Sequence, residues 1–321
     1  MIEVSGLFKS YGPIQAIHDI NFKVKKGEVV GFLGPNGAGK STTMKIITGS
    51  MAPSGGSVRV AGFDVFEDPI EVKKRIGYLP ENPPVYGDMS VESYLKFVAK
   101  LKGVEASRVK AQVEKSIEKT DLGSVRRRLI QNLSKGYRQR VGIAQALVSD
   151  PEVLILDEPT SGLDPRQVAE VRALIKELKG EHTIILSTHI LPEVQAMCER
   201  IIIINRGHIV AQDSLEGLST RMAGATQVKI KVARPSGEVE KSLQAIPGVS
   251  ALVKSEHGYA MAIASGGAAD GATDGVVERI AEAAVQSRAG LLELRRESAD
   301  LEEIFLKLTT SEETQTTGGA V

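Results

Sequence analysis

The 321-residue sequence contains a single cysteine, Cys198, and no excess of either charge, because it has 40 basic and 40 acidic residues. One cysteine cannot form an internal disulfide, and it excludes a zinc site built from cysteines. This scarcity of cysteine is typical of proteins from a reducing compartment such as the cytosol. Zero net charge gives no reason to expect an extended nucleic-acid surface, and we expect no nucleic acid among the partners.

Long hydrophobic runs are also missing. A helix that crosses a membrane needs roughly 18 or more consecutive apolar residues, whereas the longest runs, such as 153–156 and 201–204, have the length of strands. The first residues, Met1–Ser5, lack the basic and apolar regions of a signal peptide. If the protein acts at a membrane, we therefore expect another component to hold it there.

What is present is an alternation of buried strands and helices over residues 1–220. Hydrophobic residues make up 42% of the chain and charged residues 25%, as in ordinary globular proteins, and the length suggests about two domains. The alternation predicts an α/β domain with a mixed, largely parallel sheet. Strands are expected at 29–33, 153–156 and 183–186, and helices at 42–48, after Ser90 and around 168–178, the last one capped by Asp164 and Pro165.

The pattern changes near residue 220, and residues 225–309 predict a small α+β domain. Strands are expected at 226–232, 259–264 and 291–294, and helices at 239–246, 276–287 and around 301–308. The glycine-rich stretch 265–275 predicts a flexible loop. The polar end, 310–321, predicts a disordered tail.

Residues Gly34–Ser41 match the phosphate-binding pattern G-x-x-x-x-G-K-S/T. Glycines let the backbone wrap closely around phosphates, and the following helix adds its positive N-terminal end. A predicted strand precedes the motif and a predicted helix follows it, which is the context that the motif requires. Lys40 is expected to reach the β- and γ-phosphates and Ser41 to bind Mg²⁺.

A pair of acids, Asp157 and Glu158, follows the buried run 153–156. Both carboxylates should emerge at the C-terminal end of a strand, where open α/β sheets bind their ligands. Asp157 is expected to hold the Mg²⁺ shell, and Glu158 to act as the general base for an attacking water. Alone, the pair would be interpreted as solvated acids, but the phosphate-binding motif favours the catalytic interpretation.

Residues Leu133–Arg140, with the sequence Leu-Ser-Lys-Gly-Tyr-Arg-Gln-Arg, resemble the Leu-Ser-Gly-Gly-Gln signature of ATP-binding-cassette (ABC) transporter ATPases. They depart from its commonest form at Lys135 and Tyr137. Asp164 after Ser-Gly-Leu and His189 after Leu-Ser-Thr complete the motifs of that family in order. The resemblance covers about residues 1–220 and implies a P-loop NTPase fold with a helical signature subdomain.

The resemblance implies ATP and Mg²⁺ as cofactors and gives roles to further residues. Tyr11 would stack on adenine, and His189 would contact the γ-phosphate and orient the water near Glu158. Ser134 and Gly136 would contact ATP bound to a second copy, so that two ATP molecules are shared across a two-fold interface. The residues expected at ATP are Tyr11, Gly34, Asn36, Gly37, Ala38, Gly39, Lys40, Ser41, Thr42, Ser134, Gly136 and Asp164; those at Mg²⁺ are Ser41, Glu81 and Asp157; the catalytic ones are Glu158 and His189.

One position departs from the family pattern. Glu81 follows Ile76–Pro80 where the family usually has a glutamine that senses Mg²⁺ and touches the membrane subunit. A carboxylate can also bind Mg²⁺, but it adds negative charge beside the phosphates. The prolines at 83 and 84 should stiffen this loop, which suits the transmission of motion.

The stretches 76–86 and 298–308 resemble a subgroup that contains ATPases of bacterial exporters, gliding-motility-associated transporters and large lipid exporters. This implies a second ATPase subunit, identical or a close paralogue, separate membrane permease subunits, and a peripheral location on the cytoplasmic face of the inner or plasma membrane. The small C-terminal domain would be regulatory or only a packing extension.

The leading hypothesis is therefore an ATPase that powers export. An alternative is mechanical or assembly work at the cell envelope. A soluble ABC protein of DNA repair or translation would usually carry two cassettes or a long coiled coil, and this sequence has one cassette and no sustained heptads.

Overall fold

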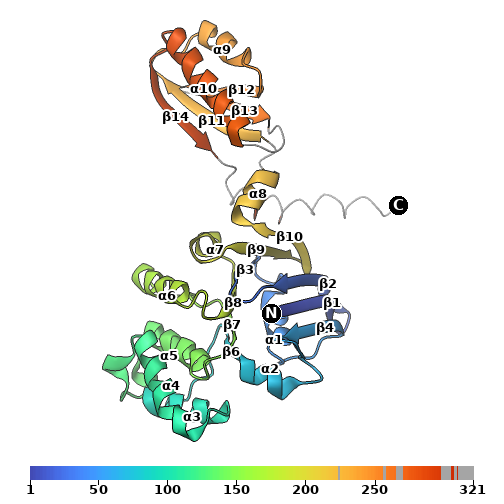
Figure 1. Ribbon diagram of the computed structural model, residues 1–321, viewed down its shortest axis with the longest axis vertical. Coiled ribbons are helices and arrows are strands. Elements are labelled where there is room, and N and C mark those ends of the chain that lie inside the picture. The colour runs from blue at the N-terminus through green and yellow to red at the C-terminus, as the bar shows by residue number, and fades with distance from the viewer. Residues whose placement is uncertain (223–224, 256–257, 265–269, 298–304, 307–308, 310–321) are drawn as a thin grey trace. The chain divides into compact units, whose positions relative to one another are not determined.

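The structure is a computed structural model that describes residues 1–222, 225–255, 258–264, 270–297, 305–306 and 309. The chain divides into two compact units, one formed by Met1–Leu215 and the other within Glu216–Ser311 (Figure 1). In the described residues, no helix has the length and apolarity that a membrane crossing requires.

A six-stranded sheet forms the centre of the first unit. Its strands are β3 (Val29–Leu33), β6 (Ile76–Leu79), β7 (Val153–Asp157), β8 (Thr183–Thr188), β9 (Arg200–Asn205) and β10 (His208–Ser214). They lie in the order β10-β9-β3-β8-β7-β6, and all neighbours are parallel except β10 and β9. Every residue of β3, β7 and β8 is buried, as expected for strands covered on both faces. The predicted mixed, largely parallel sheet is confirmed.

A second, antiparallel sheet was not foreseen. It contains β1 (Ile2–Tyr11), β2 (Ile14–Val24), β4 (Gly55–Val60) and β5 (Phe63–Asp64) in the order β2-β1-β4-β5. Helix α1 (Lys40–Ile47) packs with both sheets in one core, which includes Met44, Ile20 and Phe32. The N-terminal hairpin is thereby held close to the first turn of α1.

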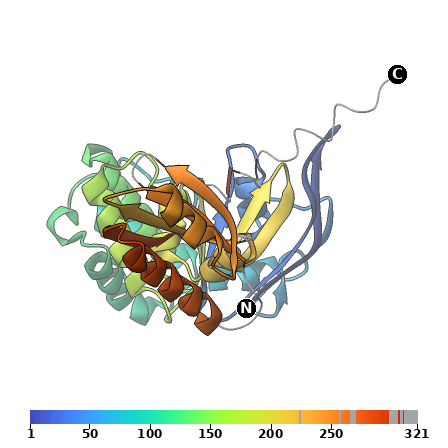
Figure 2. The same cartoon turned by 90° about the horizontal axis from the view of Figure 1, so that it is seen from above.

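The helices of the first unit form two groups. Helices α6 (Pro165–Glu177) and α7 (Leu191–Met197) lie on the opposite side of the central sheet from α1 and α2 (Pro69–Arg75) (Figure 1). Helices α3 (Val91–Leu101), α4 (Ala106–Lys119) and α5 (Lys135–Leu147), with short turns η1 (Gly123–Val125) and η2 (Ile130–Asn132), share a separate core. Figures 1 and 2 place these green helices and the blue antiparallel sheet at opposite ends of the unit.

The second unit is an antiparallel sheet with two helices packed against it. Its strands, in the order β12-β13-β11-β14, are β11 (Ala225–Val232), β12 (Val249–Ser255), β13 (Gly258–Ala264) and β14 (Leu291–Glu297). Helices α9 (Gly237–Gln244) and α10 (Asp270–Gln286) contribute Leu243 and Ile280 to a core with Tyr259 and Met261. Helix α8 (Leu215–Met222) spans the division between the units.

Two details of the second unit differ from the prediction. Strand β12 was not predicted, because most of its residues are exposed and give no alternating pattern. Helix α10 begins at Asp270, so the prediction of a loop over 270–275 is wrong. Val276, Ile280 and Ala284 anchor this helix in the core, and extending a helix that already exists costs far less than nucleating one. The predicted tail, 310–321, and nearly all of the predicted helix around 301–308 lie outside the described residues.

Candidate active site

The phosphate-binding motif connects β3 to α1. Gly34 has no room for a side chain, because a Cβ atom there would lie 2.3 Å from the carbonyl oxygen of Ile204. Gly39 precedes α1 with φ of 103°, a conformation that glycine adopts without strain. Asn36 and Gly37 are exposed, Ala38 is buried, and Ser41 and Thr42 are half-buried in the first turn of the helix. The loop therefore opens toward solvent in front of the N-terminus of α1, where backbone amides attract anions.

Lys40 is buried and folds back over the loop that carries it. Its Nζ donates to the carbonyl oxygens of Gly34 at 2.9 Å and Pro35 at 3.2 Å. The same Nζ lies 3.6 Å from Oε1 of Glu158. The lysine thus joins the phosphate loop to the end of β7.

Glu158 is a buried acid with an unusual backbone. It lies directly after β7 with φ of 49°, in the left-handed region that few non-glycine residues adopt. Its amide donates to the carbonyl oxygen of Ser187 at 2.9 Å. Nδ1 of His189 lies 3.0 Å from both carboxylate oxygens, and the His189 side chain is 44% exposed. Strain of this kind persists where the surrounding structure enforces it and is frequent at active sites.

Asp157, the last residue of β7, is buried, and its Oδ1 has no hydrogen-bond partner among the described residues. The same holds for Oγ of Ser187, its register neighbour on β8. Burial, and secondarily the charge of Asp157, raises the pKa of the Tyr78 phenol to about 12. Unpartnered oxygens of this type fit Mg²⁺, which prefers oxygen ligands. Glu81 is exposed and follows β6 at the same edge of the sheet, since Leu79 pairs with Leu156.

The signature residues lie beside the segment that carries Asp164. Ser134 is exposed and caps α5 by accepting a hydrogen bond from the Tyr137 amide at 3.3 Å. A Cβ atom on Gly136 would lie 2.4 Å from Oε1 of Gln167 in α6. Among the described residues, no hydrogen bond or ion pair joins the signature to Lys40.

Asp164 caps α6, as predicted, by accepting a hydrogen bond from the Gln167 amide at 3.0 Å, with Pro165 in the first turn. The side chain is exposed. Its remaining acceptor positions are therefore accessible from outside the chain.

Tyr11 ends β1 with a half-exposed ring. Its hydroxyl donates to Sδ of Met51 at 2.9 Å, and Nζ of Lys9 lies 5.4 Å from the ring centroid. The paired strand β2 touches the phosphate loop, because a Cβ atom on Gly39 would lie 2.9 Å from the carbonyl oxygen of Ala16. The ring thus belongs to a hairpin that adjoins the loop.

Comparison with known proteins identifies the family of the chain. The ABC transporter family model matches residues 17–161. The ABC transporter ATP-binding protein NatA of Bacillus subtilis (strain 168) is 39% identical over 207 residues, which cover 64% of this chain and 84% of NatA. The chain belongs to the family of ABC transporter ATP-binding proteins. It is an ATPase, which binds and hydrolyses ATP.

Other relatives and solved structures cover different parts of this ABC ATPase. The linearmycin resistance ATP-binding protein LnrL of Bacillus subtilis is 31% identical over 310 residues, 96% of this chain and 98% of LnrL. A solved ATP-binding subunit of an ABC transporter has a TM-score of 0.64 at 30% identity and covers 69% of this chain and 92% of its own. The dimeric ABC transporter cassette MJ0796, with a TM-score of 0.62, 24% identity and coverage of 67% and 99%, shows the shared fold.

The sequence analysis missed one buried acid of the ABC ATPase. Glu193 in α7 contacts Thr160, two residues after Glu158, and Thr188, immediately before His189. The sequence feature that could have identified Glu193 is its position in a short helix whose other inward-facing residues, such as Leu191 and Val194, are apolar. A charged residue on such a face requires partners inside the protein.

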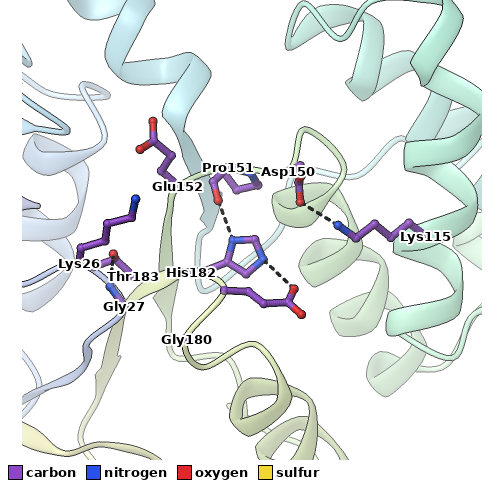
Figure 3. A pocket seen from close by; sticks show the side chains of 10 residues that line it. Lys26, Gly27, Lys115, Asp150, Pro151, Glu152, Gly180, His182 and Thr183 are labelled. Carbon is purple, nitrogen blue, oxygen red and sulfur yellow. Dashed lines mark hydrogen bonds and ion pairs between the residues drawn. The ribbon is translucent and has the colours of Figure 1, made fainter.

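A cavity of about 360 Å³ lies at the other edge of the central sheet, where β7 and β8 begin (Figure 3). Buried His182 lines it, with Nδ1 2.6 Å from the carbonyl oxygen of Pro151, and Lys115 pairs with Asp150 at 3.1 Å. None of the predicted site residues lines this cavity. Its position separates it from the phosphate loop, which lies where the parallel strands end.

Proposed function

We propose that this ABC ATPase uses Mg²⁺ and the cluster of Lys40, Glu158 and His189 to hydrolyse ATP, and that hydrolysis powers export through separate membrane subunits. The observation that carries the catalytic part is the placement of one buried carboxylate within 3.6 Å of the phosphate-loop lysine and 3.0 Å of a half-exposed histidine.

The phosphate loop binds and orients the nucleotide. The backbone of Gly34–Gly39 and the residues Ser41 and Thr42 surround the phosphates, Lys40 turns from the loop carbonyls toward the phosphate oxygens, and Tyr11 stacks on adenine. Ser41, Asp157 and Glu81 would hold Mg²⁺, which would neutralise charge on the phosphate oxygens when bound.

Glu158 is the general base. It accepts the proton of the attacking water, and its burial beside Lys40 keeps the carboxylate fixed at the end of β7. The Nδ1 atom of His189 forms a hydrogen bond with this carboxylate. The other ring nitrogen, Nε2, is then available to face the γ-phosphate. The histidine thereby orients the base and the phosphate relative to each other.

Two copies of the chain complete two sites. Ser134 and Gly136 reach the ATP held by the partner, and Asp164 lies at the interface. The exposure of Ser134 supports this arrangement, and the cassette MJ0796 was solved as a dimer. A close paralogue could replace the second copy.

Export by separate permease subunits is supported by the relatives. They include the bacitracin transport ATP-binding protein BcrA of Enterococcus faecalis, the lantibiotic transport ATP-binding protein SrtF of Streptococcus pyogenes and the daunorubicin resistance ATP-binding protein DrrA3 of Streptomyces coeruleorubidus. We place the chain at the cytoplasmic face of the inner or plasma membrane, bound to its permease. None of these names favours mechanical or assembly work at the envelope.

We assign residues 1–220 to the ATPase domain, 225–309 to an accessory domain that regulates or stabilises the dimer, and 310–321 to a tail. Support for the accessory domain comes from its own hydrophobic core and from LnrL, whose similarity extends over 96% of this chain.

The test is a Glu158→Gln variant. Loss of the general base should slow hydrolysis by about 10²-fold or more, while ATP still binds and holds the dimer closed. Tagged variant protein is purified with ATP and Mg²⁺ from detergent-solubilised membranes of its own cells, and co-purifying proteins are identified. A stoichiometric multi-span membrane protein supports the exporter. Hydrolysis at the wild-type rate would disprove the base, and recovery of ribosomes or DNA would disprove the exporter.

A further inference from the structure

The side chain of Glu193 is 2% exposed and accepts a hydrogen bond at each carboxylate oxygen. Thr160 donates to Oε1 at 2.5 Å, and Thr188 donates to Oε2 at 2.9 Å. Both threonines are themselves buried.

The two threonines belong to the two segments that carry the proposed catalytic residues. Thr160 lies two residues after Glu158, and Leu163 donates its amide to the Thr160 carbonyl oxygen at 3.2 Å. Thr188 immediately precedes His189, and its hydroxyl also accepts a hydrogen bond from the amide of Ile190 at 3.1 Å. One buried carboxylate therefore connects the segment after β7 to the segment after β8.

The phosphate loop is part of the same connection. The Gly34 amide donates to the Thr188 carbonyl oxygen at 3.4 Å. A displacement of Thr188 would therefore change the position of His189, which follows it in the chain, and of Gly34, the first residue of the phosphate loop.

A packing role does not explain an acid at this position. The neighbouring inward residues of α7, Leu191, Val194 and Met197, are apolar and buried. Burying a carboxylate costs free energy that an apolar side chain would avoid, so its presence is explained by the groups it holds. A carboxylate places an acceptor oxygen opposite each hydroxyl, whereas an amide would place an acceptor opposite one hydroxyl and an NH₂ donor opposite the other.

We propose that Glu193 is a positioning residue for ATP hydrolysis, which fixes Glu158 relative to His189 by holding Thr160 and Thr188. The inference rests on the roles proposed above for Glu158 and His189. Catalytic groups must be held to within a fraction of an ångström, and a misplacement of about 1 Å can cost 10²-fold in rate. Loss of this link should lower kcat and leave ATP binding intact.

Matched substitutions at the threonines provide the test. Thr160→Val and Thr188→Val keep the shape of the side chain and remove the hydroxyl, whereas Thr160→Ser and Thr188→Ser keep the hydroxyl. We expect each valine variant to lower kcat by about 10-fold or more with KM within about 2-fold of wild type, and each serine variant to retain most of the activity.

Glu193→Gln extends the test to the shared partner. Since both threonines act through one carboxylate, Glu193→Gln combined with both valine substitutions should be about as slow as Glu193→Gln alone. Steady-state ATPase kinetics are measured on the full-length protein with ATP and Mg²⁺, beside ATP affinity and the midpoint of thermal unfolding. If Glu193→Gln does not fold, the valine and serine pairs decide alone.

Valine variants with wild-type kcat, or kcat losses that the serine variants share, would overturn the inference. Glu158→Gln measured in the same series separates the two proposals. If it is inactive while the valine variants are fully active, only the role of Glu193 fails. If it hydrolyses ATP at the wild-type rate, the assignment of the base fails.

Discussion

Asp164 allows the stability of a helix to be separated from the activity of the enzyme. Its carboxylate caps α6 through the bond from the Gln167 amide at 3.0 Å, and we propose that it also lies at the dimer interface. Asp164→Ala removes the cap and the charge. Asp164→Asn removes the charge and keeps an acceptor that is equally favoured at this position.

The expected magnitudes differ between the two variants. Replacing an N-cap by alanine costs about 1 kcal/mol, and losing a negative charge at an exposed helix N-terminus costs about 0.3–1 kcal/mol. Asp164→Ala should therefore lower the free energy of unfolding by about 1–2 kcal/mol, and Asp164→Asn by less than about 1 kcal/mol. In a unit the size of Met1–Leu215, each kcal/mol shifts the melting temperature by about 2–4 °C. ATPase activity should fall by similar factors in both variants, because both lack the interface charge.

Differential scanning calorimetry can follow the melting of the first unit, and a steady-state ATPase assay reports the function. If Asp164→Ala melts at the wild-type temperature, the argument from the cap is wrong. If Asp164→Asn hydrolyses ATP at the wild-type rate, the carboxylate has no role at the interface, whatever the stability shows.

Three further predictions concern other parts of the first unit. Burial alone would raise the pKa of Glu28, but hydrogen bonds from Arg200 and from the Lys25 amide outweigh it and lower the pKa. Glu28→Gln should thus lower the free energy of unfolding by about 0.5–1 kcal/mol at pH 7; the difference should disappear in urea unfolding as the pH falls below the ordinary value of 4.5 and through the lowered pKa. Burial, with the charges of nearby acids, raises the pKa of Cys198 to about 12, so a thiol reagent at pH 8 should label the protein only after denaturant is added; rapid labelling of the native protein would contradict this burial. Gly34→Ala places a Cβ atom 2.3 Å from a backbone oxygen, and should abolish ATP binding in a calorimetric titration, with tight binding as the contrary result.

The phosphate loop and the acid pair were predictable because their signals are local. A strand, a glycine loop and a helix follow one another within Val29–Ile47, and four apolar residues determine where Asp157 and Glu158 emerge. The contact between Glu158 and His189 is not local, since 31 residues separate them. The family resemblance implied that His189 lies near Glu158. The residues alone could not show it, because it depends on the register of the parallel pair β7 and β8, and only the type of sheet was predicted.

The remaining features lacked a local signal. Strand β12 is an exposed edge strand, so its hydrophobic pattern is weak. Glu193 finds its partners through tertiary contacts with two loops. The start of α10 was hidden because glycine-rich composition favours a loop, whereas the packed turns that follow allow the helix to extend. In the proposed dimer, the signature of one copy lies at the phosphate loop of the other. A single sequence does not reveal this placement, and it was expected only because the motif resembles that of the family.

The backbone conformation at position 158 and the proposed catalytic role of Glu158 favour different amino acids. At φ of 49°, glycine or asparagine would relieve a backbone strain of about 1–3 kcal/mol. Neither residue has a carboxylate, so neither could accept the proton of the attacking water. A library of variants sorted for thermal resistance alone should therefore accumulate these residues at position 158 and lose turnover. The same library sorted for growth that depends on the transporter should keep glutamate. The amino acid at this position would then record whether selection acted on the chemistry or only on the fold.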